Sequence, residues 1–311
     1  MRRLAVAIVI LGALGLVAFW FLSAPRTVDA AALPNHAPDV KNGEYIFTAG
    51  GCSSCHAAPP AGAKCTDPAT PDKLNLAGGR CLVTPFGTFY IPNISPDPES
   101  GIGGWTDIQF VNAMMRGVSP NGAHYYPAFP YTSYQRMRLE DVLDLKAYID
   151  TLPAVRSSVP GHDLALPFRL RRGLGLWKLL FLDGEPYRPQ ARMSAAAQRG
   201  GYLVEGPGHC GECHTPRNLA GGKIESLKLS GAPNPEGQGR IPNITPHENG
   251  LGKWSAEEII DALSTGFSPE FDVLGGTMAK VVENTAKLSA DDRAAIAAYL
   301  KAIPALPGTA R

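Results

Sequence analysis

Two short motifs combine cysteine and histidine at the spacing that attaches haem covalently to protein. They are Cys52-Ser53-Ser54-Cys55-His56 and Cys210-Gly211-Glu212-Cys213-His214. Two thiols separated by two residues match the two vinyl groups on one edge of a porphyrin, and the histidine that follows then lies over the iron. We therefore predict two haem c groups with iron, bound by Cys52, Cys55 and His56 and by Cys210, Cys213 and His214.

Three other uses of these cysteines fit the sequence less well. A structural zinc site needs four ligands, and the second motif offers only its own cysteines and histidine together with His209. A thioredoxin-like redox pair expects a strand–helix–strand context, which is missing. Three plain disulfides would not explain why four of the six cysteines fall into two identical short spacings.

The sixth position of each haem iron decides between electron transfer and substrate chemistry. Met278 is the only methionine after Met193, and we expect it in a loop before the last helix. A thioether ligand raises the reduction potential of haem, as suits an electron carrier. We predict that His214 and Met278 are the two axial ligands of the second iron.

The first half of the chain departs from this pattern. Counting from the matched glycines Gly117 and Gly266, the position of Met278 is occupied by Phe129, which cannot bind iron. We predict His56 and Met137 as axial ligands of the first iron, although Met137 aligns roughly with an apolar core position. His124 and an open sixth site are the alternatives.

Cys65 and Cys81 lie outside both motifs, in a segment that is longer in the first half than in the second. We expect a disulfide between them, which would stabilise the fold by about 3 kcal/mol. A regulatory thiol pair in a redox sensor or assembly factor is the alternative.

The sequence around the motifs is an internal duplication. Ile91-Pro92-Asn93-Ile94-Ser95-Pro96 recurs as Ile241-Pro242-Asn243-Ile244-Thr245-Pro246, and Trp105, Ser119-Pro120 and Tyr148 recur as Trp254, Ser268-Pro269 and Tyr299. The order of these elements is the same in both halves. We interpret residues 37–153 and 191–305 as two copies of one domain, joined by a linker over residues 154–190.

Each copy is predicted to be small and mostly α-helical, with strand patterns nearly absent. The expected helices cover residues 40–47, 106–116 and 140–152 in the first copy, and 195–204, 255–263 and 290–303 in the second. The linker contains an apolar and basic stretch from Leu166 to Leu182. It is either a packed connector or a segment that touches the membrane surface or a partner.

The N-terminal segment, residues 1–23, has the properties of a membrane anchor. Arg2 and Arg3 precede an apolar run from Leu4 to Leu22, which is about 28 Å long as a helix. We interpret it as an uncleaved transmembrane helix, with a removed signal peptide as the alternative. The positive-inside rule then places the rest of the chain outside the cytoplasm, on the periplasmic side of a bacterial inner membrane.

The composition sets broad limits on function. The 311 residues are 44% hydrophobic and carry a net charge of +1, so packed domains are expected and nucleic acid is not an expected partner.

Several stretches resemble the cytochrome c subunits of membrane-bound bacterial alcohol, gluconate and aldehyde dehydrogenases. They are Asn93 to Trp105, Tyr126 to Tyr131, Gly175 to Phe181 and Gly200 to Asn218. The resemblance implies two tandem cytochrome c domains after the transmembrane helix. It also implies a dehydrogenase subunit as electron donor, and a quinone, an oxidase or another cytochrome as acceptor.

This sequence departs from the resemblance in two respects. Members of that family commonly carry three haems, whereas two motifs are present here, and many have methionine where this chain has Phe129. We predict an electron carrier without substrate chemistry of its own. The rival hypothesis is a dihaem enzyme, such as a peroxidase or an oxidase of a small inorganic donor, with an open sixth site at the first haem.

Overall fold

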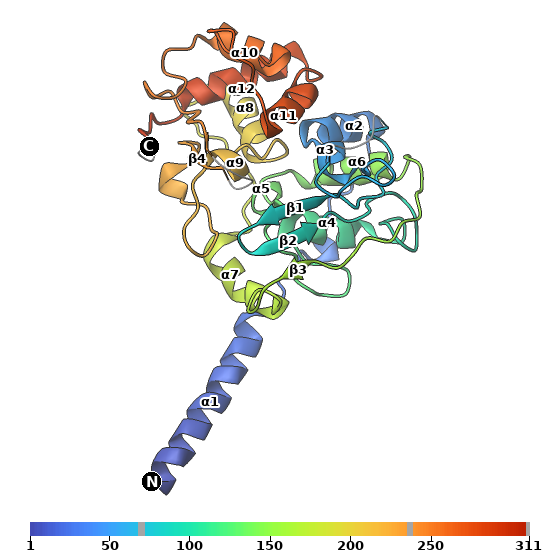
Figure 1. Ribbon diagram of the computed structural model, residues 1–311, viewed down its shortest axis with the longest axis vertical. Coiled ribbons are helices and arrows are strands. Elements are labelled where there is room, and N and C mark those ends of the chain that lie inside the picture. Colours follow the sequence, from blue (N-terminus) through green and yellow to red (C-terminus); the bar gives the residue numbers. More distant parts are fainter. Residues whose placement is uncertain (68–71, 235–238, 309–311) are drawn as a thin grey trace.

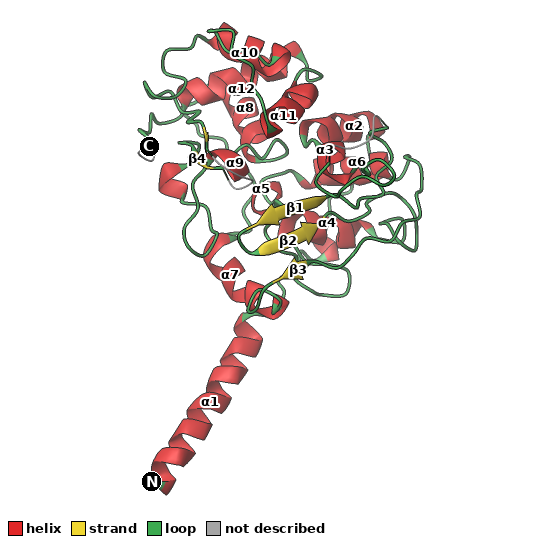
Figure 2. Ribbon diagram, viewed as in Figure 1, coloured by secondary structure: helices red, strands yellow, loops and turns green. Residues whose placement is uncertain are grey.

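Helices dominate the structure, a computed structural model that describes residues 1–67, 72–234 and 239–308 (Figure 2). The α-helices are α1 (Arg2–Leu22), α2 (Val40–Ala49), α3 (Cys52–His56), α4 (Asp107–Arg116), α5 (Tyr131–Tyr134), α6 (Leu139–Ile149), α7 (Leu174–Phe181), α8 (Ala195–Glu205), α9 (Gly211–His214), α10 (Ala256–Thr265), α11 (Thr277–Thr285) and α12 (Ala290–Ala302). Short 3-10 helices are η1 (Ala30–Ala32), η2 (Arg171–Gly173) and η3 (Glu225–Leu227).

Two hydrophobic cores are built on equivalent helix pairs. In the first core α2 crosses α6, and in the second α8 crosses α12 (Figure 1). A Cβ atom on Gly43 would lie 2.0 Å from the Asp144 carbonyl oxygen, and one on Gly200 would lie 1.8 Å from the Ala295 carbonyl oxygen. Only glycine therefore lets each pair of backbones approach so closely.

The middle helix of each half begins where it was expected, and α4 also ends as expected, whereas α10 continues to Thr265 beyond the predicted end at residue 263. Thr106 caps α4 in a capping box with Gln109, and Ser255 caps α10 in a capping box with Glu258. Each helix ends at a glycine in the left-handed conformation, Gly117 in α4 and Gly266 in α10. The recurring residues thus specify the same helix boundaries twice.

The expectation that strands are nearly absent was wrong for the first half. A three-stranded antiparallel sheet consists of β1 (Cys81–Thr84), β2 (Gly87–Tyr90) and β3 (Asp163–Leu164). Cys81 pairs with Tyr90 and Gly87 pairs with Leu164, so the linker supplies the third strand. A second small sheet pairs β4 (Ala232–Pro233) with β5 (Arg240–Ile241). These strands are too short to show a clear alternation of apolar and polar residues.

Helix α1 projects away from the folded body (Figure 1). It has 21 residues and none of them is buried, and among the described residues it is the one helix long and apolar enough to cross a membrane. Its C-terminal end is fixed to the body, because Ser23 is buried and packs against the backbone of Gly175 in α7. The exposed apolar surface of α1 is consistent with the membrane anchor.

Candidate haem-binding sites

Each Cys-x-x-Cys-His motif folds into a single helical turn, α3 or α9. In both turns the first cysteine is half-buried and the second is exposed, so the thiols occupy matching environments. Burial raises the pKa of Cys52 and of Cys210 to about 12, which keeps both groups as protonated thiols at neutral pH. The four thiols have the type and spacing that thioether attachment of haem requires.

The histidine of each motif is oriented by the carbonyl group of a distant proline. His56 Nδ1 lies 2.9 Å from the Pro92 oxygen, and His214 Nδ1 lies 2.8 Å from the Pro242 oxygen. Nδ1–H donates to the carbonyl, so Nε2 carries the lone pair that a metal ligand needs. Burial lowers the pKa of both histidines, which favours the same neutral form.

The asparagine after each proline braces the loop that carries this carbonyl. Asn93 accepts from the Ser95 backbone N–H at 2.8 Å and donates to the Val155 oxygen at 2.7 Å. Asn243 accepts from the Thr245 N–H at 2.8 Å and donates to the Leu306 oxygen at 2.7 Å. From the sequence alone, the Ile-Pro-Asn repeat indicated duplication, and this role was not predicted. The recurrence of Ile-Pro-Asn after each motif was the sequence signal that could have indicated this role.

The two motifs lie against each other across the boundary between the cores. His209 directly precedes the second motif, and its Nε2 lies 3.3 Å from the Gly50 carbonyl oxygen. Its ring packs edge-on against the Tyr134 ring, with the two centroids 5.7 Å apart. Asn284 from α11 donates to Ser54 Oγ in the first motif at 2.9 Å. The contacts fix the position of one motif relative to the other.

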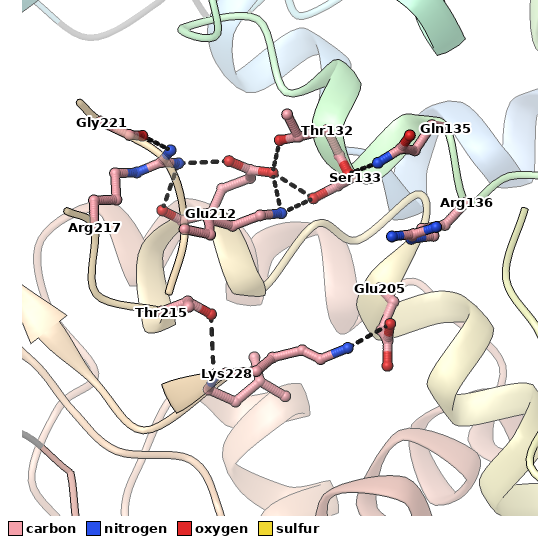
Figure 3. A network of polar contacts seen from close by, with 12 residues as sticks. Thr132, Ser133, Gln135, Arg136, Glu205, Glu212, Thr215, Arg217, Gly221 and Lys228 are labelled. Carbon is pink, nitrogen blue, oxygen red and sulfur yellow. Dashed lines mark hydrogen bonds and ion pairs between the residues drawn. The ribbon is translucent and has the colours of Figure 1, made fainter. Parts of the chain in front are cut away.

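Glu212, inside the second motif, is the centre of a polar network between the two halves (Figure 3). Its carboxylate accepts from Thr132 Oγ1 at 2.7 Å and from the Ser133 hydroxyl, both in α5. Lys223 and Arg217 form ion pairs with it at 2.8 Å and 2.5 Å. Although burial opposes the charge, these two cations and the hydrogen bonds lower the pKa of Glu212 to about 2. No role was predicted for Glu212 from the sequence.

Met278 lies in the first turn of α11 and is half-buried, so the expectation of a loop was wrong. The preceding glycine pair, Gly275 and Gly276, hid the start of this helix in the sequence. The sequence count matched Met278 with Phe129, but Phe129 lies in a bend before α5, whereas Met278 lies inside α11. Isolated bridges pair Val118 with His124 and Phe267 with Val273, and they put the two loops in the same register.

Met137 is 1% exposed and belongs to the first core, against which Cys52 of the first motif also packs. Its counterpart Leu288 is 5% exposed in the second core. His124 is also buried, but it lies against the end of α1, where Nε2 is 2.9 Å from the Ser23 carbonyl oxygen. His124 therefore lies at the base of the anchor, where its Nε2–H donates to Ser23.

The expected disulfide between Cys65 and Cys81 is confirmed, with the two Cα atoms 5.0 Å apart. It joins the loop after the first motif to the start of β1, and a backbone hydrogen bond from Cys81 to the Cys65 carbonyl closes the same loop. A closed disulfide at this position supports a structural role rather than a thiol switch.

Comparisons with known proteins identify the relatives of this chain. The family model described as cytochrome c matches residues 40–153. A protein of Cereibacter sphaeroides named diheme cytochrome c-type is 50% identical over 299 residues, which cover 96% of each chain. The fructose dehydrogenase cytochrome subunit of Gluconobacter japonicus is 37% identical over 87% of this chain and 54% of that protein.

A third relative is the cytochrome c subunit of the quinone alcohol dehydrogenase of Gluconobacter oxydans. It is 34% identical over 88% of this chain and 57% of that subunit. The chain thus spans nearly all of the first relative and little more than half of each of the two dehydrogenase subunits.

Proposed function

Because this chain belongs to the cytochrome c family, we propose that it is an electron carrier with two covalently bound haem c groups in two tandem cytochrome c domains. The domains span residues 37–153 and 191–305, and residues 154–190 link them. The observation that carries the proposal is the pair of motifs in which a proline carbonyl orients the histidine, His56 on Pro92 and His214 on Pro242.

The residues of both motifs fit haem c. Cys52 with Cys55, and Cys210 with Cys213, would form the thioether bonds, and His56 and His214 would each present Nε2 to the iron. When bound, haem c supplies a one-electron couple at its iron. His214 is buried and His56 is half-buried, the pKa of both is lowered, and apolar cores adjoin both motifs, as suits the binding of such an apolar group.

We propose Met278 as the sixth ligand of the second iron and Met137 as that of the first. The half-buried position of Met278 after the glycine pair, and the burial of Met137 in the core that Cys52 contacts, support these roles. The location of His124 counts against that residue, because it lies against Ser23 at the end of α1, whereas Cys52 packs against the core that contains Met137. An open site at the first iron remains the alternative.

The contacts between the motifs support electron exchange within one chain. His209, directly before the second motif, contacts Gly50, and Asn284 of α11 contacts Ser54 of the first motif. Haem groups bound at the two motifs would therefore belong to neighbouring parts of one folded body.

We propose that the electron donor is a dehydrogenase subunit, because the relatives include cytochrome subunits of fructose and alcohol dehydrogenases. The acceptor would be a quinone, an oxidase or another cytochrome. Helix α1 would hold the carrier at the periplasmic side of a bacterial inner membrane, beside these partners.

One observation favours a second candidate function. Counted from the matched glycines, Phe129 stands in the first half where Met278 stands in the second. An open first iron would permit substrate chemistry, and the chain would then be a dihaem enzyme, with peroxidase-like activity as one form.

Absorption spectra of the reduced protein before and after carbon monoxide separate the two functions. We expect c-type bands that carbon monoxide leaves unchanged, because strong ligands cap both irons. A shift in about half of the haem would contradict the assignment of Met137 and favour the enzyme.

A further inference from the structure

A cavity of about 340 Å³ lies where the anchor meets the folded body, away from both haem motifs. It is lined by the turn at residues 121–123, by His124, and by Arg171 and Arg172 of η2. The turn forms its rim, where Asn121 and Gly122 are exposed. Figure 1 shows α7, which η2 directly precedes, at the base of α1.

The position of the cavity along α1 coincides with the headgroup region of a bilayer. The 21 residues of α1 extend about 32 Å, which is the thickness of the hydrocarbon core. Arg172 donates to the Trp20 carbonyl at 2.6 Å and to Ser23 Oγ at 2.9 Å, and its guanidinium lies 4.3 Å from the Trp20 ring centroid. The cavity is therefore attached to the end of the membrane span.

The cavity carries positive charge that the described residues leave uncompensated. Among residues 1–67, 72–234 and 239–308, neither Arg171 nor Arg172 forms an ion pair with a carboxylate, whereas the neighbouring Arg169 lies 3.8 Å from Asp163. The guanidinium of Arg171 lies 5.0 Å from the ring centroid of Tyr126. Guanidinium groups hold phosphate well because several N–H donors lie in one plane.

His124 adds a hydrogen-bonding group that lacks a partner. It is 2% exposed, and in the described structure its Nδ1 has no hydrogen-bond partner. Burial, together with the cations Lys178 and Arg172, lowers the pKa of His124, so the ring is neutral. Since Nε2–H donates to the Ser23 carbonyl, Nδ1 is an acceptor. An acceptor left unpaired at a buried site costs free energy unless a ligand satisfies it.

Exposed apolar side chains surround the arginines of η2. Leu166, Phe168 and Leu170 are 73%, 42% and 65% exposed, and Trp20 on the last turns of α1 is 62% exposed. Basic residues interspersed with exposed apolar ones are typical of segments that lie in a membrane interface.

We propose that this cavity binds the headgroup of an anionic phospholipid whose polar part carries hydroxyl groups, as phosphatidylglycerol does. Arg171 and Arg172 hold the phosphate, and Nδ1 of His124 accepts a hydrogen bond from a headgroup hydroxyl. The acyl chains lie beside α1 and the exposed Phe168. The lipid fixes the orientation of the folded body on the membrane. The inference depends on α1 crossing the bilayer and is independent of the number of haems.

Lipid retention by the full-length, haem-loaded protein tests the proposal. The protein is held in a neutral detergent and titrated with dioctanoyl phosphatidylglycerol or dioctanoyl phosphatidylcholine, and bound lipid is counted by native mass spectrometry. We expect one phosphatidylglycerol per chain and about tenfold weaker binding of phosphatidylcholine. Equal binding of the two lipids would overturn the proposal without the need for any variant.

Two matched variants and a competitor sharpen the test. Arg171→Gln should weaken phosphatidylglycerol binding about tenfold, whereas Arg169→Gln, in the same segment but outside the cavity, should leave it unchanged. An equal loss of phosphatidylglycerol binding in both variants would show that general surface charge binds the lipid, and it would contradict the proposed binding site. Displacement of the lipid by inorganic phosphate at equal concentration would show a free-anion site instead. An unchanged haem spectrum in each variant keeps these outcomes separate from the proposed electron transfer.

Discussion

In each motif histidine, a distant carbonyl group sets which ring nitrogen is available for the proposed bond to iron. This carbonyl lies 36 residues along the chain from His56 and 28 residues from His214. His56 donates to Pro92 and His214 to Pro242, both within the repeated Ile-Pro-Asn sequence. Such outer partners fix the tautomer and raise the basicity of a ligating imidazole. The sequence motif predicts the ligand, and the Ile-Pro-Asn repeat supplies the carbonyl group that orients the histidine.

Met278→Leu tests the axial ligand of the second iron. Loss of the thioether should lower one of the two reduction potentials by on the order of 100 mV and open that iron to carbon monoxide. Potentiometric titration followed at the haem bands measures the shift.

Met193→Leu is the matched control for this variant, because Met193 is 7% exposed in the second core and has no proposed role at the iron. Unchanged potentials in both variants would show that Met278 is a packing residue.

Glu212→Gln tests the ionic network between the two halves. Because the folded-state pKa of Glu212 is lowered to about 2, its charge stabilises the native protein above the ordinary pKa of glutamate, and this contribution is lost as the pH falls toward 2. The stabilisation amounts to as much as about 3 kcal/mol. Urea denaturation at pH 7 and pH 3 should show a smaller pH dependence in the variant than in the native protein.

The exposed Glu257 of α10 provides the control for Glu212. Glu257→Gln should retain the pH dependence of the native protein. If Glu212→Gln retained it as well, the network would have no net effect on stability.

At the scale of elements, the sequence predicted the main helices because local signals determine their ends. Thr106 and Ser255, the first residues of two expected helices, form capping boxes in the structure. The final helices were also located, although α6 ends at Ile149 rather than at Leu152. Caps and apolar periodicity act within one or two turns, so they can be recognised without the rest of the fold.

Features that depend on distant partners could not be predicted in the same way. Strand β2 is four residues long and pairs with β3 of the linker, so its pairing is set by the tertiary fold rather than by its own residues. Helix α11 directly follows two glycines, which are typical of a loop. Met278 was therefore predicted in a loop although it lies in this helix. Glu212 contacts α5, which is distant in the sequence, so these contacts could not be predicted from the residues of the motif.

The helix crossings can be tested with single methyl groups. Gly43→Ala and Gly200→Ala should each destabilise the protein by about 2 kcal/mol, because the added Cβ meets a backbone carbonyl at 2.0 Å or 1.8 Å and the helices must separate. Thermal unfolding followed by circular dichroism measures the effect.

Gly161→Ala serves as the control for the crossings, since an added Cβ there would have no atom within 4 Å. Its unfolding temperature should match that of the native protein. If all three variants unfolded at the same temperature as the native protein, the helix pairs would accommodate the added methyl group without loss of stability. This result would contradict the close packing at the two crossings.

At the scale of the whole molecule, the two cores act as one body on a membrane anchor. Tyr45 and Ala49 of α2 pack against the second core, and Tyr45 donates to Asp292 at 2.6 Å. These contacts add to those between the motifs. The arrangement suits a carrier that exchanges electrons internally and meets its partners in the plane of the membrane.

The number of haems bound per chain tests the central proposal most directly. The protein is purified from a host able to attach haem c, and its haem is quantified as the pyridine haemochrome against the protein concentration. We predict two haems per chain, and one in a Cys210→Ala, Cys213→Ala double variant. A single haem in the native chain, or none, would contradict the proposal of two haem-binding domains.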